Sequence, residues 1–259
     1  MKTAVDLNCD MGESFGPWIM GADAAVLEYV SSANIACGFH AGDPMIMRRT
    51  VAGALDRGVA VGAHPALQDL QGFGRRPMQV APDEAYALVL YQVGALSGFC
   101  RALGGELSHV KPHGALYNMA ARDALLADAI ARAVHDFDPR LILFGLAGSE
   151  LVRAGRQVGL TTVNEVFADR TYQADGTLTP RSRPGAMITD LSAALAQVER
   201  MMRHGSVLAL DGTEVVIEPE TVCIHGDEPD AAQFARQLRA LLAQLGVAVR
   251  APAHSPGQC

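Results

Sequence analysis

Short apolar runs alternate with helical patterns along the whole chain, and this alternation constrains the fold more than any other feature. The runs that are typical of strands cover residues 5–9, 34–37, 59–63, 108–111, 141–144, 161–165 and 221–224. Strands this apolar are buried on both faces, as in parallel sheets covered by helices. The pattern predicts an α/β fold, a TIM-like seven-unit (β/α) barrel that forms a single domain over residues 1–259. A doubly wound open sheet is the alternative, since the handedness of crossovers does not separate the two.

Helices are expected between these strands, and two kinds of segment interrupt the rhythm. The expected helices cover residues 22–32, 44–57, 82–103, 120–135, 149–157, 189–204 and 229–245. Residues 207–218 carry Asp211-Gly212 between β-rich arms, which predicts an extra hairpin before the last strand. Two long segments, 66–80 and 167–188, exceed ordinary connections. Loops of this length in a compact domain are usually lids or binding loops.

Composition excludes several classes of protein. The chain has 259 residues, and its net charge of -7 argues against a nucleic-acid partner, because phosphate binding needs a basic surface. No apolar run approaches the roughly 18 residues of a membrane span, and the first residues do not resemble a signal peptide. The five cysteines form no CxxC pair. A scattered, odd set suits a reducing compartment, so we expect a cytoplasmic protein whose cysteines are structural.

Groups that can do chemistry gather where the predicted strands end. The strings are VDLNCDMGE, ANIACGFHAGD, VAVGAHP, SHVKPHGALYN and TVCIHGD, which begin at positions 5, 33, 59, 108 and 221. The carboxyl ends of parallel strands converge on one rim, and barrel enzymes build their active sites there. The pattern therefore predicts an enzyme with its site at this rim.

The first strand places Asp6, Asn8 and Asp10 on one side, because side chains alternate along a strand. A lone buried carboxylate costs several kcal/mol, so each must be paired, coordinated or catalytic. Asp6 is interpreted as a structural hydrogen-bonding group. Asp10, at the strand end near Glu13, is better placed for acid–base work or metal ligation.

Histidines end the second and third strands. His40 and His64 occupy equivalent positions, and His113 and His225 follow later strands. With Asp10 they could bind a divalent metal, since catalytic zinc takes three protein ligands. However, the chain has no HExxH and no CxxC, so the spacing favours weak metal binding or none, and a divalent metal remains the alternative.

Lys111 lies between two histidines in HVKPHGALYN, with His109 and His113 on the same side of the strand. A buried lysine must meet an anion. We expect a phosphate or carboxylate of the substrate, with an internal salt bridge as the structural alternative.

Arginines cluster in the two long loops. Arg75, Arg76, Arg170 and Arg181 stand beside glycines and prolines, where guanidinium groups can hold carboxylate or phosphate in bidentate fashion. The chain contains no GxxxxGK[ST], no GxGxxG and no GxSxG, so the sequence shows neither a known nucleotide loop nor a nucleophile elbow.

Together these strings resemble the LamB/YcsF family. They are DLNCDMGESFG, ANIACGFHAGDP, GAHP with GFGRR, VKPHGALYN, EVFADRTY with DGTLTPR, and CIHGD, in order along nearly the whole chain. The resemblance implies a seven-unit barrel related to polysaccharide deacetylases. It also implies ATP-dependent opening of the lactam 5-oxoproline to L-glutamate with two partner subunits, B and C. The family's acidic and basic positions fall on Asp10, Glu13, His40, His64, Lys111, His113 and Asp227.

The implied reaction makes sense of these groups. Phosphorylating the carbonyl oxygen of a lactam makes that oxygen a leaving group, and the transferring phosphate needs cations such as Lys111 and a loop arginine. A base must then activate water, and His40, His64 or Asp10 can serve. We expect Asn8, Arg75, Arg76, Arg170 and Arg181 to bind substrate. The rival hypotheses are a metal-dependent, deacetylase-like hydrolase and a non-catalytic ligand-binding protein of the complex.

Overall fold

Seven parallel strands form a closed barrel in the computed structural model, which describes residues 2–225 and 230–253. They are β1 (Ala4–Met11), β2 (Ser32–Ala36), β3 (Ala60–His64), β4 (His109–Val110), β5 (Ile142–Leu146), β6 (Thr162–Phe167) and β9 (Thr221–His225). Neighbours pair in chain order, and β9 pairs with both β6 and β1. The predicted seven-unit barrel is confirmed, and the open-sheet alternative is wrong because the β1–β9 ladder closes the sheet.

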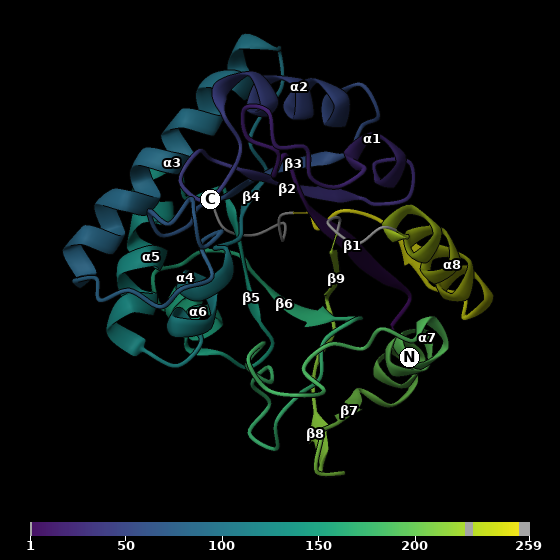
Figure 1. The fold of residues 1–259 in the computed structure, drawn as a ribbon. Coiled ribbons are helices and arrows are strands. Elements are labelled where there is room, and N and C mark those ends of the chain that lie inside the picture. Colours follow the sequence, from purple (N-terminus) through teal and green to yellow (C-terminus); the bar gives the residue numbers. More distant parts are fainter. Residues whose placement is uncertain (1, 226–229, 254–259) are drawn as a thin grey trace.

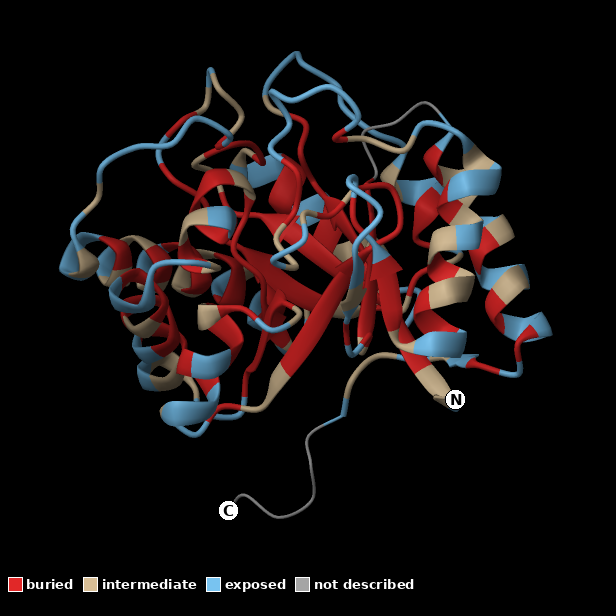
Figure 2. Cartoon of the chain, turned by 90° about the horizontal axis from the view of Figure 1, so that it is seen from below, coloured by how far each residue is buried: buried red, intermediate tan, exposed pale blue. Residues whose placement is uncertain are grey.

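Helices surround this barrel (Figure 1). They are α1 (Asp23–Val26), α2 (Pro44–Leu55), α3 (Pro82–Ala102), α4 (Gly114–Ala120), α5 (Ala124–Phe137), α6 (Glu150–Gln157), α7 (Leu191–His204) and α8 (Ala231–Gln244). Figure 2 shows the strands almost entirely buried and the outer sides of the helices exposed. The main hydrophobic core lies between strands and helices, which is the arrangement expected of strands that are too apolar to face water.

Side-chain caps explain where several helices begin. The carboxylate of Asp43 accepts hydrogen bonds from the backbone N–H groups of Met45 (2.8 Å) and Ile46 (3.1 Å), and Pro44 occupies the first turn of α2. Asp123 caps α5 and Asp190 caps α7 in the same way. These caps satisfy N–H groups that have no partner inside the helix.

Three local predictions differ from the structure. The helix expected over 22–32 shrinks to α1, because Ser31 and Ser32 are drawn to the barrel and both donate hydroxyl hydrogen bonds to Asp6. The helix expected over 120–135 begins only at Ala124, because Asp123 caps α5 there, and the sequence interpretation missed α4, which precedes it. The sequence interpretation also missed β10 (Ala248–Val249), which pairs with β1 and is too short to show a period.

The interior of the barrel is polar rather than apolar. The Asn8 amide accepts hydrogen bonds from Asn34 (2.7 Å) and Lys111 (3.1 Å), and donates to Glu165 (3.0 Å) and Thr221 (2.7 Å). Near the start of β1, the hydroxyl groups of Ser31, Ser32 and Thr221 donate hydrogen bonds to Asp6. Burial raises the pKa of Asp6 to about 6. The structural role predicted for Asp6 therefore agrees with its contacts.

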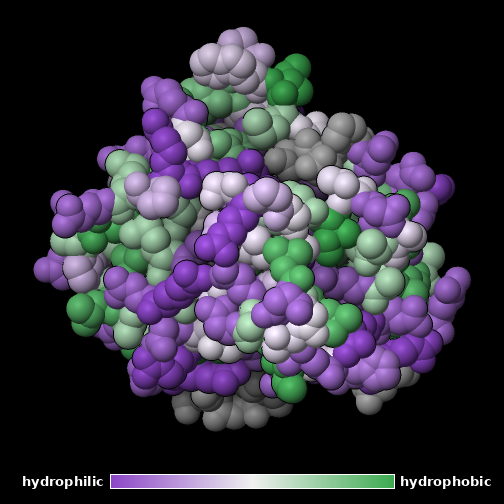
Figure 3. All heavy atoms as spheres, turned by 60° about the horizontal axis from the view of Figure 1, so that its bottom comes forward, coloured by the Kyte–Doolittle hydropathy of each residue, from purple (hydrophilic) through white to green (hydrophobic). Residues whose placement is uncertain are grey.

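The predicted hairpin is confirmed as β7 (Ser206–Leu208) and β8 (Glu214–Val216), an antiparallel pair outside the barrel. On the face drawn in Figure 3, hydrophobic side chains are interspersed with hydrophilic ones. Within the described residues, no helix combines the length and hydrophobicity needed to cross a bilayer.

Candidate active site

Asp10 lies at the centre of the carboxyl rim, near the end of β1. Its Oδ1 atom accepts hydrogen bonds from Lys111 Nζ (2.8 Å) and Asn34 Nδ2 (2.8 Å), and its Oδ2 atom lies 3.1 Å from His64 Nε2. Burial raises the pKa of Asp10, but His64 and Lys111 outweigh burial and hold the pKa well below its usual range. Asp10 is therefore a carboxylate at neutral pH.

Lys111 is fully paired inside the protein. Its ammonium lies 2.8 Å from Asp10 and 2.8 Å from Glu165, and its side chain is only 3% exposed. Burial lowers the pKa of Lys111, but Asp10 and Glu165 outweigh this and raise it well above its usual value. The internal salt bridge that was the structural alternative is present, and a substrate anion is not needed to explain why the lysine is buried.

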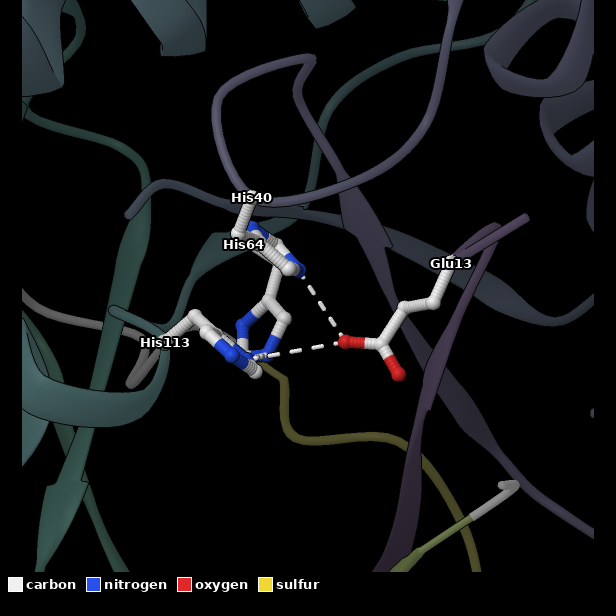
Figure 4. A group of neighbouring side chains, drawn as sticks. All are labelled: Glu13, His40, His64 and His113. Atoms are coloured by element: carbon white, nitrogen blue, oxygen red, sulfur yellow. Dashed lines mark hydrogen bonds and ion pairs between the residues drawn. The ribbon is translucent and has the colours of Figure 1, made fainter. Parts of the chain in front are cut away.

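Three histidines and one glutamate converge on one another (Figure 4), and one of the histidines, His64, contacts Asp10. Each of Glu13, His40, His64 and His113 offers one ligand atom, and these atoms lie within 4.8 Å of one another. His40 Nε2 lies 3.0 Å from Glu13 Oε1, and the rings of His40 and His113 stack with their centroids 3.8 Å apart. The four residues come from four different strand ends or loops, so no local spacing motif could have revealed them.

Backbone carbonyl groups orient two of these imidazoles. His64 Nδ1 donates to the carbonyl oxygen of Lys111 (2.7 Å), and His113 Nε2 donates to that of Phe73 (2.8 Å). When both rings are neutral, the remaining lone pairs, on His64 Nε2 and His113 Nδ1, face each other 2.9 Å apart. Two lone pairs cannot form a hydrogen bond, and His64 Nε2 also faces the Asp10 carboxylate at 3.1 Å, so this arrangement calls for a cation or for a proton on this nitrogen.

The donor set fits a divalent metal. Metal-binding histidines commonly donate their second N–H group to a carbonyl, as His64 and His113 do. Burial lowers the pKa of His40 to about 3 and that of His113 well below its usual value, so both are neutral, as ligation requires. Three imidazoles and one carboxylate suit zinc or a similar transition metal. The structure therefore removes the reason for expecting weak metal binding or none.

A second group, Asp10, Cys223 and His225, is also compact but does not suit a cation. Lys111 Nζ lies 3.1 Å from Cys223 Sγ and already neutralises Asp10. Burial raises the pKa of Cys223 well above its usual value, so the thiol stays protonated. A second positive charge next to the ammonium would be repelled.

Gly74 allows the loop after β3 to close over the histidines. Its φ of +65° is in the left-handed region, and a Cβ atom there would lie 2.8 Å from His113 Cδ2 and 2.9 Å from His40 Cβ. A side chain at this position would therefore push directly on two of the four candidate ligands.

We expect Gly74→Ala to lower the free energy of unfolding by about 2–4 kcal/mol, from backbone strain and from overpacking, and to weaken metal binding. Gly148→Ala is the matched control, because Gly148 has a φ of +77° and nothing within 4 Å of its Cβ position. Urea unfolding and metal titration of both variants check this. Equal losses in the two variants would contradict a role for Gly74 in positioning the histidines.

A cavity of about 540 Å³ opens at this rim and includes Asp10, Glu13, His64, Lys111 and His113 in its lining. His40 is buried beneath it, against Glu13. The volume falls within the range of small-molecule sites, about 300–1,000 Å³. The residues predicted to be catalytic are therefore brought together, except Asp227, which lies outside the described residues.

The predicted arginines divide into three kinds. Arg75 and Arg181 line the cavity and are exposed. Arg122, which the sequence interpretation did not select, also lines the cavity and is also exposed. Arg170 also lines the cavity, but it is buried and donates to the carbonyls of Thr179 (2.6 Å) and Ala186 (3.3 Å), so it holds its loop together. Arg76 pairs with Asp69 and lies outside the residues that line this cavity.

The expectation that Asn8 binds substrate does not fit its contacts, because both donors and both acceptor positions of its amide are satisfied inside the barrel. Conversely, three residues of the site besides Arg122 were missed. Glu165 could have been found as a charged residue in an apolar strand. His225 was noted at a strand end but not selected, and its partner Asp169, 2.5 Å away, lies in a loop with no local signal.

Comparisons with known proteins show relatives over nearly the whole chain. The chain is 63% identical over 251 residues to the A subunit of a 5-oxoprolinase from Bordetella parapertussis, covering 97% of this chain and 100% of that one. It is 61% identical over 247 residues to the A subunit of a 5-oxoprolinase from Bacillus subtilis, covering 95% and 96%.

Solved structures give the same picture. A lactam utilization protein from Thermus thermophilus superimposes with a TM-score of 0.90 at 51% identity, covering 97% of this chain and 100% of that one. The catalytic domain of a peptidoglycan N-acetylglucosamine deacetylase from Eubacterium rectale shares the fold at 11% identity, with a TM-score of 0.52 over 99% of this chain and 91% of that one. Residues 5–256 match the profile of the LamB/YcsF family, and the chain belongs to that family.

Proposed function

We propose that this chain is the A subunit of an ATP-dependent 5-oxoprolinase, which opens 5-oxoproline to L-glutamate together with partner subunits B and C. The observation that carries the proposal is identity of about 60% to proteins named as the A subunit of 5-oxoprolinase, over nearly the full length of both chains. The rim cavity supports it, because its lining combines the buried carboxylate of Asp10, the imidazole of His113, whose pKa burial lowers well below its usual value, and exposed arginines.

The cavity residues can share the work of ring opening. The substrate has a carboxylate, and a phosphorylated form has a second anionic group, so exposed guanidiniums of Arg75, Arg122 and Arg181 suit its capture. Lys111 keeps Asp10 ionised and held towards His64. Glu13, His40, His64 and His113 would hold a divalent metal, which when bound supplies Lewis-acid polarisation and a water of lowered pKa.

ATP use is part of the proposal, although this chain carries no known nucleotide loop. An amide carbonyl is a poor electrophile, and phosphorylation of its oxygen would couple ATP hydrolysis to ring opening. We propose that the phosphorylating machinery involves the partner subunits. We further propose that the chain acts as one barrel domain in the cytoplasm, where its four described cysteines, all buried, would stay reduced.

Partner dependence tests this function. The isolated chain is expected to release little glutamate from 5-oxoproline, whereas the chain with subunits B and C is expected to release glutamate at a rate that depends on ATP. Glutamate and ADP are measured in the same reactions. Full turnover by the isolated chain without ATP would contradict the proposal and favour a simple metal-dependent hydrolase, which the four-ligand cluster would also support.

A further inference from the structure

A further histidine, outside the Glu13–His40–His64–His113 cluster, lines the same cavity and has its own carboxylate partner. His225 is at the end of β9, and its Nδ1 atom lies 2.5 Å from Asp169 Oδ2. Both residues are buried, and the His225 ring lies against Phe167 with centroids 6.0 Å apart. The carboxylate therefore fixes both the orientation of the ring and the position of one of its protons.

The other nitrogen of this ring faces an arginine. Because Nδ1 donates to Asp169, the neutral ring has its lone pair on Nε2, and Arg181 donates to Nε2 from 2.9 Å. Burial lowers the pKa of His225, but Asp169 outweighs burial and raises the pKa above its usual value. Arg181 acts to lower it, and Asp10, which lies nearby, acts to raise it. The histidine is thus a base whose lone pair is covered by a cation.

Arg181 lies at the surface of the site rather than in the core. It is exposed, it lies in the long loop between β6 and α7, and it also contacts the sulfur of Met187. Arg181 and His225 both line the cavity, together with Asp10 and Lys111. An anionic substrate that entered the cavity would pair with the exposed guanidinium more strongly than the neutral imidazole does.

We propose that His225 is the acid–base catalyst of ring opening, that Asp169 positions it, and that Arg181 leaves Nε2 to bind the carboxylate of the incoming lactam. This inference rests on the proposed function. As the oxygen of water bonds to the carbonyl carbon of the O-phosphorylated lactam, His225 Nε2 takes one water proton. As the bond between carbon and ring nitrogen breaks, His225 returns that proton to the nitrogen, which becomes the amine, and the proton of the new hydroxyl group passes to solvent. A second water then displaces phosphate from the resulting acyl phosphate, so that glutamate and phosphate are the products.

Kinetics of the complete complex test the catalytic role. His225→Gln is expected to lower kcat at least about 100-fold with little change in KM, and melting of the isolated chain shows whether it folds. His135→Gln is the matched control, because His135 also pairs with an aspartate, Asp136 (3.3 Å), but does so on the exposed surface of α5. A His225→Gln variant that is folded and keeps more than a tenth of kcat would overturn the proposal.

Asp169→Asn gives a readout that a purely structural role would not move. Loss of the carboxylate lowers the pKa of His225, so the acid limb of the kcat profile is expected to shift to lower pH, and kcat is expected to fall at least about 10-fold. A lower kcat with an unshifted profile would assign Asp169 to structure alone and remove the positioning claim.

Nuclear magnetic resonance of the ¹⁵N-histidine-labelled chain tests the arginine directly. Addition of 5-oxoproline is expected to shift the His225 Nε2 resonance, and Arg181→Gln is expected to produce a similar shift without ligand and to weaken 5-oxoproline binding at least about 10-fold. Binding measured by calorimetry that leaves His225 unperturbed would overturn the role of Arg181. If the wild-type complex does not turn over 5-oxoproline, the proposed function fails. The spectrum of Arg181→Gln without ligand still shows whether Arg181 donates to His225 Nε2.

Discussion

Replacing Lys111 by methionine is expected to lower the free energy of unfolding by about 3–5 kcal/mol, because Asp10 and Glu165 would lose the cation that compensates their burial. Turnover by the folded fraction is expected to fall at least about 100-fold as well, since Asp10 would no longer be held as a carboxylate towards His64. Urea unfolding of the chain and turnover of the assembled complex, measured on one preparation, check both losses.

Two further variants make this test specific. Arg132→Met removes an exposed i,i+4 pair with Asp128 and is expected to cost no more than about 0.5 kcal/mol. Adding Glu165→Gln to Lys111→Met removes one of the two orphaned charges and is expected to restore part of the lost stability. An unchanged melting temperature in Lys111→Met would show that the buried ion pairs contribute little.

The purified chain is expected to bind one divalent transition-metal ion at the Glu13–His40–His64–His113 cluster. His64→Gln or His113→Gln is expected to weaken binding at least about 100-fold, since outer-sphere changes alone cost about 10–100-fold. Chelation of the ion is expected to abolish turnover by the complex. Metal analysis after dialysis and competition titration with a chromogenic chelator measure these effects.

Cys223→Ser is the matched control for the metal site. Cys223 belongs to the competing group with Asp10 and His225, where the Lys111 ammonium takes the place that a metal would need. This substitution is expected to leave metal affinity unchanged. A chain that stays metal-free in excess zinc, together with a complex that resists chelators, would instead mean that His64 and His113 share a proton.

The sequence predicted the barrel well because each strand was a separate apolar run and five of the seven ended in a group with chemistry, such as Asp10 and His64. Contacts between strand ends were harder to foresee. The pairing of Lys111 with Glu165 joins β6 to the end of β4, and no spacing along the chain encodes it. A carboxylate inside an apolar strand must be paired, coordinated or catalytic, as was argued for Asp6 and Asp10. The same argument applied to β6 identifies Glu165 as a buried carboxylate that needs a partner.

Loop residues set the limit of such reasoning. Arg76 and Arg75 are adjacent in sequence, yet Asp69 captures the first and the second lines the cavity. The carbonyls of Phe73 and Lys111 that orient His113 and His64 belong to the backbone, so their role does not depend on which side chain is present. The backbone conformation therefore determines the imidazole tautomers that favour a metal, and sequence patterns do not reveal it.

The polar interior of the barrel has a consequence for how such a chain can change. Hydrogen bonds and an ion pair link six residues across five strands or strand ends, so each position depends on the others: Asp6, Asn8, Asn34, Lys111, Glu165 and Thr221. Effects of substitutions among them should be strongly non-additive. Substitutions at these interior positions are therefore tolerated only when several change together and restore the hydrogen bonds. The apolar core between strands and helices can instead accept single substitutions that keep the side-chain volume.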